Sequence, residues 1–150
     1  MEIGQFGSWL SSWASGIALI VLCVAVHVTT LLAIHHRIGV RLKPAVAGWT
    51  STTRMPLIMG FIILLLTLLH GLEALVWASA YVAVGAIPKL HGAILFSLGA
   101  MTTYGNSDLD LVEHWRLLGA LEALNGMLLF GMTTAFVFSY FQRIWLEQPP

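Results

Sequence analysis

The chain has 150 residues, of which 58% are hydrophobic and only 9% are charged. Soluble domains carry about 25% charged residues, so this composition excludes a water-soluble domain and predicts a membrane protein. Seven basic and seven acidic residues give a formal net charge of zero, which gives no reason to expect a nucleic-acid partner.

The first long apolar segment covers residues 16–33, where 18 consecutive residues carry no charge. At about 1.5 Å per residue, a helix of this length nearly crosses a hydrocarbon core of about 30 Å. Ahead of it, aromatic and aliphatic residues recur at helical spacing over residues 3–13. We expect a separate short interfacial helix there, with Trp9 and Trp13 at the level of the lipid headgroups.

A basic connector follows at residues 35–54, where four cationic residues stand without an acidic one: Arg37, Arg41, Lys43 and Arg54. Pro44 and Gly48 should prevent a continuous helix through this connector. The second long apolar segment begins near Pro56 and runs to about Val84. Its length of about 29 residues exceeds a membrane crossing, so we expect it to tilt or to project beyond the bilayer.

A shorter apolar segment, residues 91–103, follows a break at residues 85–89. Its 13 residues would cross about half of a membrane as a helix. Apolar runs of about 10–14 residues are typical of a buried core helix or of a re-entrant segment. A polar stretch then precedes the last long apolar segment, residues 115–145. The sequence therefore predicts three full spans and one half-length helix.

The positions of Lys and Arg predict the orientation in the membrane. With the 35–54 connector in the cytoplasm, five cationic residues lie inside and only Lys89 and Arg116 lie outside. We expect a multi-pass protein of the plasma (inner) membrane. Its residues 35–54 and C-terminus would be cytoplasmic, and its N-terminus would lie outside. Residues 91–114 must then enter the membrane from the outside and return there.

A half-length helix that enters and leaves on one side is typical of a pore loop. Non-helical backbone at membrane depth is tolerated only where protein buries it or where it lines water. The negative end of the helix dipole, near Thr103, would favour a cation. Carbonyl groups from four subunits can replace the hydration shell of that ion. On this pattern alone, a short core helix in a membrane bundle is the alternative.

Two stretches resemble the pore module of potassium channels. FSLGAMTTYGNSD at residues 96–108 is similar to the filter region of small bacterial ion-channel or two-pore-domain-like proteins, F-S-x-x-T-x-T-T-x-G-Y-G-D. WRLLGALEALNG at residues 115–126 is similar to their W-R-L-L-G and L-E-A-x-N-G. The ungapped match covers about residues 65–145. Placing Tyr104 and Gly105 on the family's Tyr-Gly would require a compensated deletion, so we prefer the ungapped alignment.

The resemblance implies an all-α membrane protein with three transmembrane helices plus a re-entrant pore helix and filter loop, assembling as a tetrameric channel. It divides the chain into an N-terminal region at residues 1–55, a pore module at residues 56–146 and a short tail at residues 147–150. The expected partners are a homotetramer and membrane lipids, with no soluble substrate. The expected ions are K⁺ or Na⁺, with no cofactor. No nucleophile–base pair or phosphate loop indicates an enzyme.

The resemblance assigns the selectivity filter to seven consecutive residues: Thr102, Thr103, Tyr104, Gly105, Asn106, Ser107 and Asp108. A monovalent cation would bind around Thr103, Tyr104 and Gly105. Asn106 and Ser107 stand where the family has Tyr and Gly. A filter of this kind requires left-handed backbone, which costs a non-glycine residue roughly 1–2 kcal/mol. We therefore expect Ser107 to weaken the selectivity for potassium.

Glu122 and Asn125 match the family's L-E-A-x-N-G, which implies that they support the filter. We expect Glu122 to hydrogen-bond the back of the pore loop, with Asn125 in the same network; a titrating gate is the alternative for Glu122. The phenylalanines at 130–141 are assigned to packing or to lipid contact. A pore-lining or hinge face is assigned to Gly126, Gly131, Met132, Ala135 and Ser139, whose two glycines permit a bend or close packing.

His70 and Glu73 stand at positions i and i+3, on one face of a helix. Such a pair supplies only two metal ligands, so we interpret it as a helix-packing contact. His27 and His70 would lie at similar depth in antiparallel spans, as bis-histidine haem ligation requires. A b-type haem-binding membrane anchor is therefore one alternative function. A non-conducting relative of the channels, with a collapsed filter, is another.

Overall fold

The computed structural model describes residues 3–37, 51–105 and 111–146. Within these ranges the chain is helical, and it contains no strand. Its elements in chain order are α1 (Ile3–Arg37), α3 (Ser51–Ala83), α4 (Leu90–Met101), the short 3-10 helix η2 (Glu113–Trp115) and α5 (Arg116–Leu146). Three helices, α1, α3 and α5, are long and apolar enough to cross a membrane. The chain is therefore a multi-pass membrane protein.

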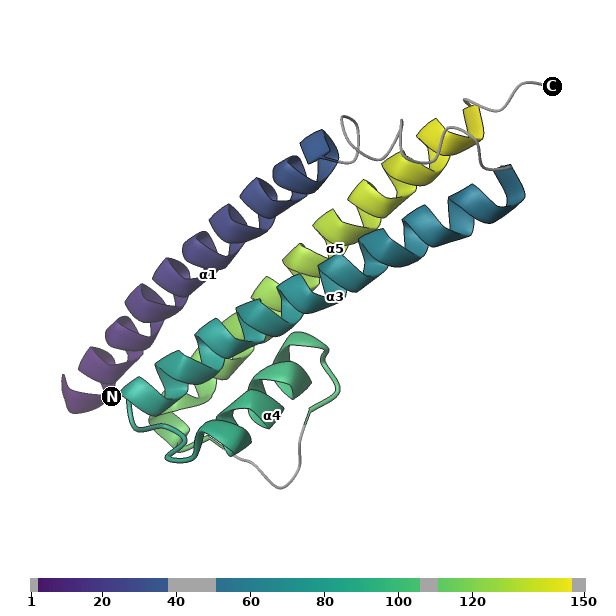
Figure 1. Cartoon of the computed structure of the whole chain (residues 1–150). Coiled ribbons are helices and arrows are strands. Elements are labelled where there is room, and N and C mark those ends of the chain that lie inside the picture. Colours follow the sequence, from purple (N-terminus) through teal and green to yellow (C-terminus); the bar gives the residue numbers. More distant parts are fainter. Residues whose placement is uncertain (1–2, 38–50, 106–110, 147–150) are drawn as a thin grey trace.

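The three long helices lie side by side, with α1 and α5 running in one direction and α3 in the other (Figure 1). α4 begins where α3 ends and runs back along the bundle, packed against both α3 and α5. The start of α1 lies at the same end as α4, and the end of α5 lies at the opposite end. At the α4 end, the Ser12 hydroxyl of α1 donates to the carbonyl oxygen of His114 in η2, at 3.2 Å.

The expected separate helix at residues 3–13 is not observed, because α1 continues through it as one helix of 35 residues. No proline interrupts this stretch, so nothing ends the helix before residue 16. The serines within it are compatible with a helix, since the Ser15 hydroxyl donates to the Ser11 carbonyl oxygen at 2.7 Å. The interfacial position of Trp9 and Trp13 stays a prediction.

The second span also begins earlier than expected, because α3 starts at Ser51 rather than near Pro56. Pro56 is accommodated inside the helix, and the expected boundary between residues 55 and 56 therefore falls within α3. Of the expected basic connector, residues 38–50 lie outside the described residues. The helix ends at Ala83, and the Ala86 N–H donates to the Tyr81 carbonyl oxygen at 2.9 Å to close the turn into α4.

The buried side chains of the bundle form two apolar clusters. The cluster nearer α4 includes Trp77 and Tyr81 of α3 with Leu118 of α5. The other cluster includes Ile62 of α3 and Tyr140 of α5. In each long helix, polar side chains stand between the residues of the two clusters: His27 in α1, His70 and Glu73 in α3, and Thr133 in α5. The apolar core is therefore divided by one polar layer.

Candidate functional site

The chain folds back on the end of α4 at the start of the expected filter. Backbone N–H groups of three residues donate to carbonyl oxygens in the last turns of α4: Thr102 to Leu98, Thr103 to Ala100 and Gly105 to Gly99, each at 3.1 Å. The Thr102 hydroxyl adds a bond of 2.6 Å to the Leu98 carbonyl oxygen. These bonds satisfy carbonyl groups that the end of a helix would otherwise leave unpaired.

The backbone after α4 alternates in handedness. Thr103 has φ 56° and Gly105 has φ 71°, whereas Tyr104 between them has no positive φ. Glycine adopts this conformation without a steric cost, but a β-branched residue with positive φ is a strained outlier. A glycine at position 105 is compatible with this conformation, whereas nothing in the sequence indicated it at Thr103. The remaining filter residues, Asn106, Ser107 and Asp108, lie outside the described residues.

An open pocket of about 420 Å³ lies beside this turn. Its lining joins Thr102 and Thr103 to two side chains of α5, Met127 and Phe130, and to Met101 of α4. The sequence analysis missed Met127 and assigned Phe130 to packing or lipid. Their spacing of i and i+3 on α5, directly after Gly126, is the signal that could have found them.

Gly126 allows α5 to lie against the end of α4. A Cβ atom at this position would lie 2.2 Å from the Met101 carbonyl oxygen and 2.7 Å from its Cα, so only glycine fits. Gly131, by contrast, faces open space. Gly131, Ala135 and Ser139 are exposed, whereas Met132 is partly buried against the cluster near α4. The pore-lining or hinge role of these residues stays a prediction.

Glu122 lies behind α4, fully buried between three helices. Its Oε2 accepts a hydrogen bond of 2.7 Å from the Tyr81 hydroxyl of α3, and its Oε1 contacts the Ser97 hydroxyl of α4. Ser97 also reaches the Ala74 carbonyl oxygen at 2.9 Å. Asn125 does not join this network, since neither atom of its buried amide has a hydrogen-bond partner among the described residues. That Glu122 supports a filter stays a prediction.

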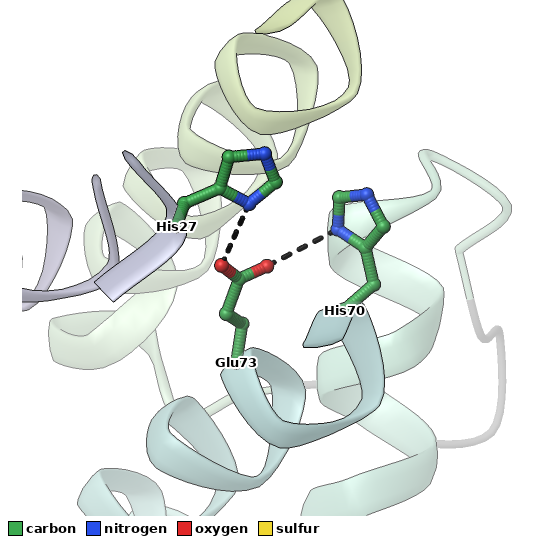
Figure 2. Close-up of side chains that lie close together, drawn as sticks. All are labelled: His27, His70 and Glu73. Carbon is green, nitrogen blue, oxygen red and sulfur yellow. Dashed lines mark hydrogen bonds and ion pairs between the residues drawn. The ribbon is translucent and has the colours of Figure 1, made fainter. Parts of the chain in front are cut away.

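A second polar site lies in the layer between the two apolar clusters. The two oxygens of Glu73 face one imidazole each: Oε1 lies 2.9 Å from His27 Nδ1, and Oε2 lies 3.1 Å from His70 Nδ1 (Figure 2). The Thr133 hydroxyl oxygen closes the arrangement, at 3.1 Å from His27 Nε2 and 3.0 Å from His70 Nε2. We call these four residues the polar ring.

The polar ring contains the expected His70–Glu73 contact and adds two residues from other helices. The sequence analysis placed His27 at the depth of His70 but did not predict its contact with Glu73, and it did not predict that Thr133 takes part, because contacts between separate helices leave no local spacing pattern. The imidazole rings of His27 and His70 lie with their centroids 5.3 Å apart. Both rings face the same carboxylate and the same hydroxyl, so the geometry offers no place for a porphyrin between them. The haem-anchor alternative gains no support.

The comparisons with known proteins agree with the interpretation of the chain as an ion channel. A family model described as "Ion channel" matches residues 57–143, which is more than half of the chain. Neither the curated proteins nor the solved structures gave a match. The matched range begins early in α3, includes α4 and its following turn, and ends late in α5. The chain therefore belongs to the ion channel family, and its α3–α4–α5 unit is a pore module of the potassium-channel superfamily.

Proposed function

We propose that the chain is one subunit of a homotetrameric cation channel, whose pore passes the turn at residues 102–105. The observation that carries this proposal is the alternating backbone at the end of a half-length helix, with left-handed Thr103 and Gly105 on either side of Tyr104. Alternation of this kind turns successive carbonyl groups toward one axis, where they can replace the hydration shell of an ion.

The direction of α4 supports a cation rather than an anion. Its C-terminal end precedes the turn directly, and the C-terminus of a helix carries a partial negative charge. If α4 enters the membrane from the outside, this end points toward the bilayer centre. The turn and the negative helix end then act on the same ion, held around Thr103, Tyr104 and Gly105.

A single copy of the chain leaves this region incomplete. Thr102 and Thr103 are exposed, and Tyr104 is 90% exposed. Non-helical backbone at membrane depth must be covered by protein or must line water. One turn also supplies only a quarter of a carbonyl ring. Four copies around a central axis would satisfy both requirements.

We expect this channel to discriminate little between potassium and sodium. Asn106 and Ser107 replace the family's Tyr and Gly, and Ser107 adopts left-handed backbone less readily than glycine. A filter that keeps fewer stacked carbonyl sites should bind potassium less selectively. The same substitutions are the reason to retain a non-conducting relative as the second candidate.

Two measurements test the proposal, beginning with native mass spectrometry in mild detergent, where we expect tetramers. The second is cation flux into liposomes, in which Gly105→Ala should abolish most of the wild-type flux because alanine disfavours φ 71°. Gly60→Ala is the matched control, since Gly60 faces open space on α3. Monomers alone, or full flux in Gly105→Ala, would contradict the proposed pore. A tetramer without flux would favour the non-conducting relative.

A further inference from the structure

The polar ring has fewer hydrogens than its contacts require. Four contacts of 2.9–3.1 Å join its members. The Glu73 carboxylate can only accept, the Thr133 hydroxyl has a single hydrogen, and each neutral imidazole has one N–H. Three hydrogens are therefore available for four contacts. In one contact, two acceptor atoms face each other with no hydrogen between them. A positively charged partner that accepts a lone pair, such as a metal ion, would satisfy the remaining contact.

The contact without a hydrogen bond is the one between His70 and Glu73. His70 Nδ1 and Glu73 Oε2 lie 3.1 Å apart, but neither has a hydrogen-bond partner among the described residues. Glu73 is only 1% exposed, so water at the surface cannot donate a hydrogen bond to Oε2. Buried polar atoms without partners are unusual and costly. Both atoms point into the space between the two imidazoles and the carboxylate (Figure 2).

The donor set matches the needs of a transition-metal ion. One ligand atom from each of His27, His70 and Glu73 lies within 4.8 Å of the others. Tetrahedral zinc bonds of about 2.0–2.1 Å separate neighbouring ligand atoms by about 3.3 Å. His27 Nδ1 lies 2.9 Å from Oε1 of Glu73 and His70 Nδ1 lies 3.1 Å from Oε2, so each imidazole meets a different carboxylate oxygen at nearly this separation. Two imidazoles and one carboxylate suit zinc and related ions better than they suit K⁺, Na⁺ or Ca²⁺.

A metal bound to the two Nδ1 atoms would also resolve the hydrogen shortage. Each Nε2 would then carry the ring hydrogen and would donate it to Thr133. The Thr133 hydroxyl oxygen has two lone pairs and lies 3.0 and 3.1 Å from the two Nε2 atoms, so it can accept both. Metal-binding histidines commonly donate their second N–H to such an outer partner, which fixes the orientation of the ring.

We propose that His27, His70 and Glu73 bind a divalent transition-metal ion of the zinc class, with Thr133 as the residue that orients both imidazoles. The ion would tie together α1, α3 and α5. Its site is separate from the filter turn, and its existence does not depend on ion conduction. Carboxylate and imidazole groups inside a membrane-spanning bundle are rare unless they have such a function.

Zinc binding to the purified wild-type protein tests the proposal without any flux measurement. The protein is prepared with a histidine-free affinity tag, stripped with a chelator, and titrated with Zn²⁺ by calorimetry with metal analysis. We expect one zinc ion per chain. We expect His27→Gln and Glu73→Gln to lose this binding. His36→Gln is the matched control, because His36 is exposed on α1 and should leave binding unchanged.

Two further measurements test the proposal even if a variant that lacks a ligand fails to assemble. Thr133→Val keeps all three ligands and should weaken zinc binding about 10–100-fold. Co²⁺ in the wild-type protein should give a visible absorption that differs from that of the aqueous ion and is typical of nitrogen–oxygen ligation. The proposal is overturned if wild-type protein binds no zinc, if an assembled Glu73→Gln protein binds it with unchanged affinity, or if Co²⁺ shows only its aqueous spectrum.

Discussion

Glu122 and Glu73 are both buried in the helical bundle, at 0% and 1% exposure, but their neighbours differ. Hydroxyl groups contact Glu122, one from Tyr81 and one from Ser97. Imidazole rings contact Glu73. A hydroxyl brings its own hydrogen to a carboxyl group, whereas an imidazole nitrogen either donates a hydrogen or binds a metal through its lone pair.

The same residue type therefore lies in two different chemical environments in one bundle. Glu122 fastens α4 to its neighbours, whereas the ring around Glu73 retains atoms that can bind an ion. Phe130 brings the polar ring next to the pocket beside the turn at residues 102–105. Its aromatic ring stacks on His70 with centroids 4.3 Å apart, and the same side chain lines the pocket together with Thr102 and Thr103. A change of occupancy at the polar ring would therefore act next to the wall of this pocket.

The largest loss of stability is expected from substitution of Glu122. Glu122→Ala leaves the buried Tyr81 hydroxyl without an acceptor and opens a cavity, so we expect a loss of about 3 kcal/mol in stability. Thermal unfolding of the assembled protein in detergent measures this loss. Glu122→Gln should be much milder, because its amide can still accept from Tyr81 and can donate to Ser97. Equal losses in both variants would show that the carboxylate charge, and not hydrogen bonding, holds α4.

A substitution at Gly126 should have a smaller effect, and it should change the pore end of the bundle without changing the polar ring. Gly126→Ala places a Cβ atom 2.2 Å from the Met101 carbonyl oxygen. We expect this overpacking to cost about 1–3 kcal/mol and to lower cation flux, because the end of α4 must shift. Zinc binding should be unchanged. Gly60→Ala is the control, since Gly60 faces open space on α3 and lies outside the proposed pore-lining face. Unchanged flux in Gly126→Ala would show that α4 and α5 need not pack so closely.

The three spans could be predicted from the sequence because uncharged runs of their length have no other stable environment. The prediction of a separate helix at residues 3–13 was wrong, because no proline ends the helix before residue 16 and α1 continues to Arg37. The positive φ of Gly105 agrees with its residue type, because glycine adopts left-handed backbone without a steric cost. The sequence could not predict the same conformation at Thr103, where the local preference of a β-branched side chain opposes the observed backbone.

Only part of the polar ring could be predicted from the sequence, and the reason is a different one. The i, i+3 spacing of His70 and Glu73 predicts their contact, because neighbouring turns of one helix bring them together. His27 is 46 residues from Glu73 in sequence, and their contact depends on how α1 packs against α3. Helix packing fixes that geometry, and it leaves no periodic pattern in the sequence.

Single-channel recording in planar bilayers tests the central claim most directly. With equal concentrations of K⁺ on one side and Na⁺ on the other, the wild-type protein should give discrete currents that reverse near zero voltage. A tenfold preference for potassium would move the reversal potential by about 59 mV. Currents that reverse near zero and disappear in Gly105→Ala are the predicted result. An intact tetramer without current, or a reversal far toward potassium, would contradict the proposed weakly selective pore.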